Sequence, residues 1–425
     1  MQDTKRATLS RSLLWILSQM NKSSRFGVVA DLAKSHGSFL FDQSSNRYLL
    51  DFFGQYSSLA VGYNHSIFKS DEFIETALKT TRNKLSNCEI SSDIAIEFDK
   101  TFRSFASASK FSHFHYACTG ALAIEAAIKA AIDYSGLPNG QIISFKKSFH
   151  GINSYGGILT DRQGPAKSRV EGFPGGYWRL INNPVIEYGV SSDKIEDLVI
   201  DAIQEVEDIF KKGLNVYCIL VEPIQCTFGD RYFTKSFFSG LRSIASRYNV
   251  PLIFDEVQTG FFASGTNWYW EQVGIKPDIV VFGKKTQLSG IMVDQKFSKI
   301  FDQPIRLEVT WDADIIDMLR CNYIIKAYKQ YNVLQNVKDR SEQLIGGIKE
   351  HPSFSNIRHA GLLIAFDIIK PEIRDDFVKK LHANGMLCSP AVDKTIRLRP
   401  HPLITSEEVD MAISLLNKTG SEIQI

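Results

Sequence analysis

Two charged residues in the stretch 251–290 have the types and the spacing for chemistry at the edge of a sheet. The apolar run 252–254 ends at Asp255, and the apolar run 279–282 ends, after one glycine, at Lys284. Apolar runs this short, bounded by proline, glycine and turn residues, are typical of buried parallel strands. The residues between them are enough for the crossover connection that parallel strands require. We therefore expect an acid and an amine at the carboxyl ends of nearby strands, where open α/β sheets bind ligands.

An acid and a lysine placed in this way fit the chemistry of pyridoxal 5′-phosphate (PLP). A lysine amine can form a Schiff base with an aldehyde cofactor, and PLP enzymes add an acid that faces the pyridine nitrogen. The acid keeps this nitrogen protonated, so that the ring can accept electrons from a substrate carbanion. The alternative is that Asp255 and Lys284 are the ordinary polar ends of two strands, and their spacing alone does not decide between the two interpretations.

A second candidate site precedes a helix predicted over residues 121–131. The segment is rich in helix-forming residues, and its isoleucines recur at every fourth position on one stripe. Thr119 and Gly120 stand just ahead of it. A helix N-terminus presents free N–H groups and the positive end of the helix dipole, which suit a phosphate, and glycine lets an anion approach the backbone. A simple Thr/Gly cap is the commoner explanation of the same pattern.

The composition is that of a globular enzyme-sized chain without an obvious charged partner. Its 425 residues are 44% apolar and 23% charged, and the net charge is +2, which gives no electrostatic case for nucleic acid or a membrane surface. Six scattered cysteines without a C-x-x-C motif argue against a disulfide framework and a zinc site. The apolar run 13–17 is too short for a signal peptide core or a membrane span. We therefore expect a cytoplasmic protein without a bound metal.

The remaining elements are predicted from hydrophobic pattern and caps. We expect a helix and a turn over about residues 1–30 and a hairpin over 37–51. A charged amphipathic helix should cover 191–213 and a central strand should begin at Val216. Beyond about Asp314 the pattern alternates helix and strand, with helices over 316–349, 372–383 and 406–417, the last with Ser406 near its N-cap.

The string DEVQTG…F…W…PDIVVFGKK, which begins at Asp255, resembles class III (ω-type) PLP-dependent aminotransferases of fold type I. Its end, FGKKTQLSG, is most similar to L-lysine ε-aminotransferases, and the resemblance runs from about residue 10 to the C-terminus. It implies an α/β fold in which a large PLP-binding domain with a mainly parallel sheet is joined to a small α+β domain. We expect an N-terminal segment at 1–60 that packs with the small domain, a large domain at 61–313 and the small C-terminal domain at 314–425.

The resemblance implies roles for residues around the cofactor ring. Lys284 would be the Schiff-base lysine, rather than the adjacent Lys285, because the lysine of the family directly follows a glycine or a serine. Asp255 would keep the pyridine nitrogen protonated, and Gln258 would approach the phenolic oxygen. Glu222, in a string similar to the EPIQGEGGD of the family, would support the cofactor site.

Other implied residues contact the phosphate and the face of the ring. Gly120 and Ala121 begin a segment similar to the phosphate-binding helix of the family, and their backbone N–H groups would bind the phosphate. In the FHG string, Phe149 would stack on the ring with His150 beside it. The VTW string resembles a segment whose threonine serves the phosphate of a neighbouring subunit, which makes Thr310 a cofactor residue and implies a homodimer.

The predicted substrate-binding residues are arginines, and here the sequence departs from the family. Arg179 lies in a string similar to W-P-R-I-D-N-P, whose arginine holds the substrate α-carboxylate, but the register differs by one residue. Arg397 corresponds to an arginine that many ω-aminotransferases pair with a movable glutamate. The Gly-Glu of the family is Cys226 and Thr227 in this chain, and threonine forms no salt bridge. Arg397 is therefore either open to a carboxylate or paired in another way. A further departure is the DAD string at 312–314, where the family has GGN.

The predicted activity is transfer of a terminal (ω) amino group, that of the L-lysine ε-amine, to a 2-oxo acid such as 2-oxoglutarate. One alternative is a PLP enzyme of the same family that uses another ω-amino acid or a diamine, or that acts as a racemase, decarboxylase or cyclising enzyme; Thr227 motivates it. A non-catalytic scaffold is the other alternative. The joint presence of the lysine, acid, glutamine and threonine argues against a scaffold.

Overall fold

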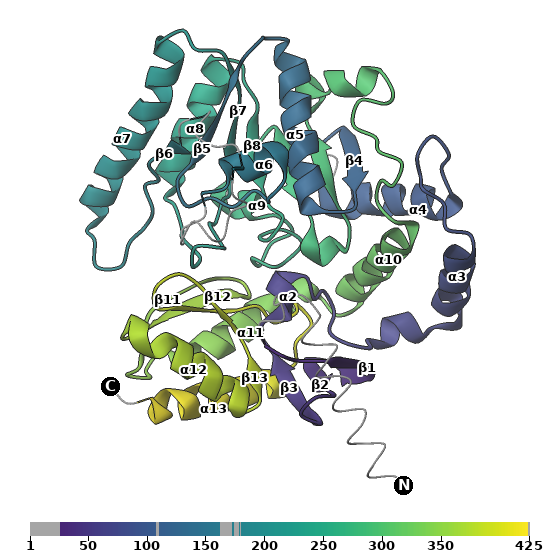
Figure 1. Cartoon of the computed structure of the whole chain (residues 1–425), viewed down its shortest axis with the longest axis vertical. Helices are drawn as coiled ribbons and strands as arrows, with labels where there is room; N and C mark the ends of the chain where they lie inside the picture. The colour runs from purple at the N-terminus through teal and green to yellow at the C-terminus, as the bar shows by residue number, and fades with distance from the viewer. Residues whose placement is uncertain (1–25, 108–109, 162–171, 174–177, 179, 424–425) are drawn as a thin grey trace.

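A seven-stranded sheet forms the centre of the larger part of the molecule (Figure 1). The computed structural model describes residues 26–107, 110–161, 172–173, 178 and 180–423. Five neighbouring strands run parallel, and the sixth, β10, is antiparallel to its neighbours on both sides. The predicted, mainly parallel α/β sheet is thus confirmed. In order across the sheet the strands are β4 (His113–Ala117), β10 (Ser289–Val293), β9 (Ile279–Phe282), β8 (Leu252–Asp255), β7 (Val216–Val221), β5 (Gln141–Phe145) and β6 (Leu180–Ile181).

Helices cover both faces of this sheet because its strands are apolar on both sides. Successive side chains of a strand point to opposite faces, and in β8 Ile253 packs with the cluster around α5 (Gly120–Ser135), whereas Leu252 and Phe254 pack with the cluster on the other face. That second face carries α7 (Ser192–Lys211) and α8 (Lys235–Arg247), which lie side by side in Figure 1. Shorter helices of this part are α6 (Ser154–Leu159) and α9 (Tyr269–Val273).

Two four-stranded sheets form the lower part of the molecule in Figure 1. One of these sheets combines strands from the N-terminal and the C-terminal parts of the chain, because β3 pairs in parallel with β13 at Leu50 and Met386. Its strands are β1 (Ala30–His36), β2 (Phe39–Asp42), β3 (Arg47–Asp51) and β13 (Met386–Leu387). The other sheet contains β11 (Phe354–Ala360), β12 (Leu363–Ile368), β15 (Thr395–Leu398) and β14 (Ser389–Pro390). Around them lie α11 (Val333–Ile348), α12 (Pro371–Ala383) and α13 (Ser406–Glu422).

The connection between the two parts is helical and irregular. It includes α2 (Gly54–Ser57), α3 (Asp71–Arg82), α4 (Asp93–Phe102) and α10 (Ile315–Gln330), and α10 packs against both α3 and α4. Within the residues described, no helix has the length and the apolar character that crossing a membrane would need.

The structure agrees with the predicted elements in some regions and differs in others, such as the start of the last helix. The last helix is capped by Thr405, not by Ser406, because the Thr405 hydroxyl accepts from the N–H of Glu408 while the Glu408 carboxylate accepts from the N–H of Thr405. The region near residue 30 holds strand β1, and the rest of the helix predicted over 1–30 lies outside the described residues, apart from a turn at Phe26. The hairpin at 37–51 is confirmed by the pairing of β2 with β3.

Candidate active site

A cavity of about 380 Å³ opens at the carboxyl ends of β7, β8 and β9, next to the first turn of α5. The parallel register of β8 and β9 sets Asp255 opposite Val281, so Asp255 and Lys284 follow neighbouring strands at the same edge. Eight of the residues predicted to contact PLP line this cavity: Gly120, Ala121, Phe149, His150, Glu222, Asp255, Gln258 and Lys284. The sheet topology therefore brings together side chains that are more than 160 positions apart in the sequence.

Lys284 enters the cavity from a strained turn after β9. Its backbone has φ +56°, in the left-handed region that side chains other than glycine seldom adopt. Gly283 just before it has no room for a side chain, since a Cβ atom would lie 2.6 Å from the Ser289 hydroxyl. Burial, reinforced by the positive charge of Arg397, lowers the pKa of the Lys284 amine to about 8. A lysine with a lowered pKa supplies the unprotonated amine that an aldehyde needs.

The neighbouring Lys285 points to a different place. Its side chain is buried, and its amine donates to the carbonyl oxygen and to the hydroxyl of Ser57, both at 2.9 Å. Burial and the charges of Arg399 and Lys284 lower the pKa of Lys285 well below its usual value. Lys284, and not Lys285, is thus the lysine that faces the cavity.

Asp255 is held by the side chain of His150. The two are buried, and Nδ1 of His150 lies 2.8 Å from Oδ2 of Asp255. On the other side of the ring, Nε2 of His150 lies 3.3 Å from the hydroxyl of Ser144. A tautomer with its proton on Nδ1 satisfies both contacts, donating to Asp255 and accepting from Ser144. The other carboxylate oxygen of Asp255 accepts from the backbone N–H of Val257 at 3.2 Å.

Glu222 is a second buried carboxyl group at the cavity. Burial and the nearby charge of Asp255 raise its pKa well above the usual value, which favours its neutral form. Its Oε1 accepts from the backbone N–H of Phe149 at 2.7 Å. Glu222 therefore ties the loop that carries the aromatic ring of Phe149 to the end of β7.

The amide of Gln258 is oriented by a buried ion pair. Nε of Arg399 donates to Oε1 of Gln258 at 3.2 Å, and the guanidinium also forms an ion pair with Asp230. Because a guanidinium only donates, the oxygen of Gln258 must face Arg399. The NH₂ group of Gln258 is then free to donate to a ligand oxygen in the cavity that this residue lines.

The start of α5 provides an anion site of close fit. Thr119 caps this helix by accepting from the N–H of Leu122 at 3.4 Å, which leaves the cavity-lining N–H groups of the first turn for a ligand. A Cβ atom on Gly120 would lie only 3.1 Å from Cγ1 of Val257, so the backbone here packs closely against another residue that lines the cavity. An amine, an acid, an amide donor, an aromatic ring and a helix N-terminus are groups that suit PLP, and the lining residues therefore fit it.

Three predicted site residues are not part of the cavity lining. Arg397 is buried, and its guanidinium donates to the carbonyl oxygen of Cys226 at 2.6 Å and to the hydroxyl of Ser389 at 3.0 Å. Thr310 is exposed at the surface of the chain. Arg179 lies outside the described residues. Thr227, which stands where the family has its glutamate, is half-buried and lines the cavity.

Sequence reasoning missed residues that orient the predicted ones. The backbone N–H of Val257 donates to Asp255. The hydroxyl of Ser144 contacts His150, and the guanidinium of Arg399 donates to Gln258. The position of Val257, between the acid and the glutamine of the Asp-Glu-Val-Gln string, could have indicated it. Arg399 could have been suspected from its place two residues after Arg397, just past the end of β15, because alternate residues of an extended segment share a face.

Comparison with known proteins gives the same assignment along nearly the whole chain. The family model for aminotransferase class-III matches residues 20–419. The L-lysine-epsilon aminotransferase of Mycobacterium tuberculosis is 31% identical over 408 residues, which are 91% of this chain and 90% of the relative. The 4-aminobutyrate aminotransferase of Kluyveromyces lactis is 31% identical over 438 residues, with 93% and 90% covered.

The solved structures include one of lysine aminotransferase from M. tuberculosis in the internal aldimine form. It superimposes with a TM-score of 0.89 at 29% identity and covers 95% of this chain and 97% of that one. Fold, cavity and sequence therefore agree on one family and one cofactor. The chain belongs to the class-III aminotransferase family and is a PLP-dependent aminotransferase.

Proposed function

We propose that this enzyme transfers the ε-amino group of L-lysine to a 2-oxo acid, for which 2-oxoglutarate is the expected acceptor. The observation that carries the proposal is that Lys284 and Asp255 face one cavity from neighbouring strands, with Gln258 and the start of α5 beside them. The donor is suggested by relatives named L-lysine-epsilon aminotransferase, which are 28–31% identical over at least 90% of the chain.

Each residue of the cavity would have a separate role in the reaction. When bound, PLP supplies an aldehyde that condenses with amines and a ring that accepts electrons from the substrate carbon. Lys284 would hold the cofactor covalently at rest and, once released, take a proton from the substrate carbon and return it to a neighbouring atom. Its pKa of about 8 lets the amine act as a base near neutral pH. Asp255, oriented by His150, would hold a proton on the ring nitrogen, and Gln258 would donate to the ring oxygen.

Arg397 would bind a substrate carboxylate. Its guanidinium contacts only neutral acceptors among the described residues, and its buried Nε has no hydrogen-bond partner there. Burial and the neighbouring Arg399 lower the pKa of Arg397 to about 10, although the charge of Asp230 acts in the opposite direction. A carboxylate would compensate this charge. Arg179 remains the predicted partner of the α-carboxylate on the strength of the sequence alone.

A homodimer would complete the site. Thr310 is exposed, and so are apolar side chains near it in the sequence, namely Ile305 at 69%, Val309 at 44% and Trp311 at 49%. The hydroxyl of Thr310 would serve the phosphate of a second copy of the chain, and the apolar residues would be buried by the same contact. Exposed apolar patches on a soluble enzyme are typical of such interfaces.

The cysteines support a reducing compartment, and we place the enzyme in the cytoplasm. None of the six cysteines, all of which lie in the described part of the chain, forms a disulfide, and Cys218, Cys226, Cys321 and Cys388 are buried in the packed interior. Burial raises the pKa of the Cys218 and Cys321 thiols, which makes them poor nucleophiles. Thiols of this kind act as small apolar side chains in the core.

The first experiment follows the absorbance of the PLP-loaded enzyme after L-lysine is added without any oxo acid. Loss of the band of bound PLP with formation of pyridoxamine phosphate is expected, and 2-oxoglutarate should restore the band. The lysine-derived product should be 2-aminoadipate 6-semialdehyde, which cyclises. Lys284→Ala should abolish the change, whereas Lys299→Met, which removes an exposed lysine that donates to the Asp133 carbonyl, should leave it intact.

Other outcomes would identify a different activity. Conversion with 4-aminobutyrate or a diamine, but not with L-lysine, would keep the aminotransferase and replace the donor. Consumption of the amino substrate without any pyridoxamine phosphate would indicate a racemase, decarboxylase or cyclising enzyme instead. The half-reaction is the deciding step because only transamination leaves the amino group on the cofactor.

A further inference from the structure

The segment that follows β3 contains a left-handed helical turn. Gly54, Gln55, Tyr56 and Ser57 have φ values of +52°, +49°, +58° and +77° in succession. Three of these four residues are not glycine, and residues with a Cβ atom disfavour this conformation. Such strain persists only where the surroundings hold it in place, and it is concentrated at functional sites.

Side chains from the turn after β9 hold the end of this segment. The amine of Lys285 donates to the carbonyl oxygen of Ser57 and to its hydroxyl at 2.9 Å each, and to the carbonyl oxygen of Leu59 at 3.5 Å. The amide of Gln287 donates to the carbonyl oxygen of Ser58 at 3.1 Å. Three consecutive carbonyl groups, those of residues 57–59, therefore accept from two side chains that lie one and three positions after Lys284.

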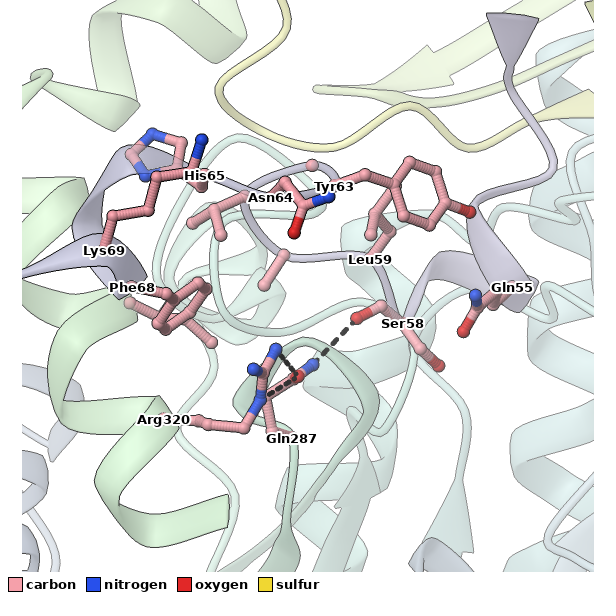
Figure 2. Close-up of a pocket in the computed structure, with 14 residues that line it drawn as sticks. Gln55, Ser58, Leu59, Tyr63, Asn64, His65, Phe68, Lys69, Gln287 and Arg320 are labelled. Atoms are coloured by element: carbon pink, nitrogen blue, oxygen red, sulfur yellow. Dashed lines mark hydrogen bonds between the residues drawn. The ribbon is translucent and has the colours of Figure 1, made fainter. Parts of the chain in front are cut away.

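Gln287 is itself fixed from the opposite side by Arg320. Figure 2 shows Gln287 between Arg320 and Ser58, with its oxygen toward the guanidinium and its nitrogen toward the Ser58 carbonyl. Nε and Nη2 of Arg320 donate to Oε1 of Gln287 at 3.3 and 3.1 Å. The guanidinium lies over the ring of Phe68, 4.5 Å from its centre. Helix α10 thus braces the contact between the two turns.

The beginning of the left-handed turn is fixed by a different group. Oδ1 of the buried Asp51 accepts from the N–H groups of Phe53 and Gly54 at 2.9 and 2.8 Å, and Oδ2 accepts from the hydroxyl of Tyr63 at 2.7 Å. A side chain at Gly54 would overlap the carbonyl oxygen of Arg399. The start of the turn is therefore fixed by Asp51 at the end of β3, and its other end is held by Lys285.

Tyr56 is the aromatic side chain of this turn. It is 48% exposed and packs edge-to-face on Phe53, with ring centres 4.6 Å apart. The turn lies next to the end of the strand that carries Arg397, because the N–H of Arg399 donates to the carbonyl oxygen of Phe52 at 2.7 Å, and Tyr56 is close enough to influence the pKa of the Arg397 guanidinium. The ring thus stands near the buried cation that, on the proposed function, binds a carboxylate.

We propose that Lys285 is a positioning residue, which holds the left-handed turn and thereby keeps Tyr56 beside Arg397 at the carboxylate-binding end of the substrate site. This inference rests on the proposed function. The two adjacent lysines then have separate tasks: Lys284 serves the cofactor, and Lys285 shapes the pocket that selects substrates with a carboxylate. The three oxygen atoms of Ser57 and Leu59 that accept from this amine hold the end of the turn against it.

The test is Lys285→Met in the PLP-loaded enzyme, with Lys299→Met as the control. Without the amine, Ser57 can leave the left-handed region, so hydrogen exchange of the amides over 53–59 should become faster while exchange in α8 stays unchanged. Borohydride reduction followed by peptide mapping should still find the cofactor on Lys284. The KM for the carboxylate substrates should rise about tenfold, the effect of one lost hydrogen bond to a charged group, with kcat changed much less.

A double-mutant cycle separates positioning from general damage. Tyr56→Phe should raise the KM for carboxylate substrates by itself and should add little to Lys285→Met, because loss of the lysine amine already lets the Tyr56 hydroxyl leave its position. Additive effects would overturn the proposal. So would unchanged exchange over 53–59, or a fall in kcat with loss of cofactor from Lys284, which would mean that Lys285 acts at the cofactor.

Two further controls keep the result interpretable. If Lys285→Met does not fold, Ser57→Ala removes one of the same hydrogen bonds at little cost in volume, and it should shift exchange and KM in the same direction by a smaller amount. An unchanged Ser57→Ala enzyme would then count against the proposal. Failure of the proposed function looks different, since the wild-type enzyme itself would give no half-reaction with any carboxylate-bearing amine.

Discussion

Nδ1 of His150 lies 2.8 Å from Oδ2 of Asp255, and both side chains are buried at the carboxyl edge of the large sheet. His150 forms a hydrogen bond with one carboxylate oxygen, and the backbone N–H of Val257 donates to the other at 3.2 Å. This arrangement fixes the plane of the carboxylate without neutralising it by a lysine or an arginine. An acid held in this way can keep a proton on a ring nitrogen in front of it, which is the electrostatic contribution expected of Asp255.

Asp255→Asn should lower kcat by at least about 10²-fold, the scale of losing one preorganised electrostatic contact in an active site. The amide has the shape of the carboxylate but not its charge, so binding of PLP should be retained. Asp278→Asn is the matched control, because Asp278 precedes β9 at the opposite end of the sheet, where it pairs with Arg242. Rapid single-turnover measurements would show the loss in the chemical step, and equal losses in both variants would contradict the assignment.

The loading of PLP onto the apoenzyme should depend on pH with an apparent pKa near that of Lys284. Burial lowers this pKa from 10.5 to about 8, so about one amine in ten is unprotonated at pH 7, compared with about one in three thousand for an ordinary lysine. The rate of loading should rise with pH up to about 8 and level off above it. Stopped-flow absorbance measures this rate, with Lys284→Ala as the control. A rate that keeps rising toward pH 10 would contradict a pKa of about 8 for Lys284.

The lowered pKa of Lys284 also predicts how the stability of the apoenzyme depends on pH. Between pH 8 and 10.5 the unfolded chain binds a proton at this lysine that the folded chain has already lost. Stability should therefore increase with pH across this window, and the contribution should be lost as the pH falls through 8. Lys284→Ala should remove the dependence, which urea unfolding at several pH values would show.

The sequence predicted the fold and the cavity well because their signals are local. Short apolar runs that end in Asp255 and Lys284 define parallel strands, and the parallel topology alone places the two residues at one edge. The helix start at Gly120 could also be predicted, since Thr119 is a typical cap. These features needed only strand pattern, turn residues and motif similarity.

The contacts that orient the site could not be predicted in this way, because they join distant segments through side chains. Nothing in the sequence around Lys285 indicates that its amine reaches Ser57, 228 positions away, or that residues 54–57 form a left-handed turn. Likewise, the pairing of Arg399 with Asp230 depends on how β15 packs against the loop after β7. Buried polar partners of this kind are set by the tertiary fold and not by local propensity.

Arg399→Met should destabilise the enzyme by about 3–5 kcal/mol, because it leaves Asp230 as an unpaired buried carboxylate. The variant also loses the bonds from the guanidinium to the carbonyl groups of Ile364 and Leu398 at 3.2 and 3.0 Å. Urea unfolding of the apoenzyme gives the change. Lys79→Ala, in a fully exposed pair with Glu75, should leave the midpoint where it was. A midpoint of Arg399→Met equal to that of the control would rule out a structural role for this ion pair.

Thr227→Glu should weaken binding of dicarboxylate oxo acids. Thr227 lines the cavity and directly follows Cys226, whose carbonyl oxygen accepts from Arg397 at 2.6 Å. A glutamate at this position can reach the guanidinium and form an ion pair with it, so that an incoming carboxylate must displace it first. We expect KM for 2-oxoglutarate to rise about tenfold or more, the scale of a charge-assisted hydrogen bond. Thr227→Gln has the same size without the charge and should change KM much less. If the glutamate and glutamine variants are equal in steady-state kinetics, Arg397 does not bind the acceptor carboxylate and its bonds to neutral groups are purely structural.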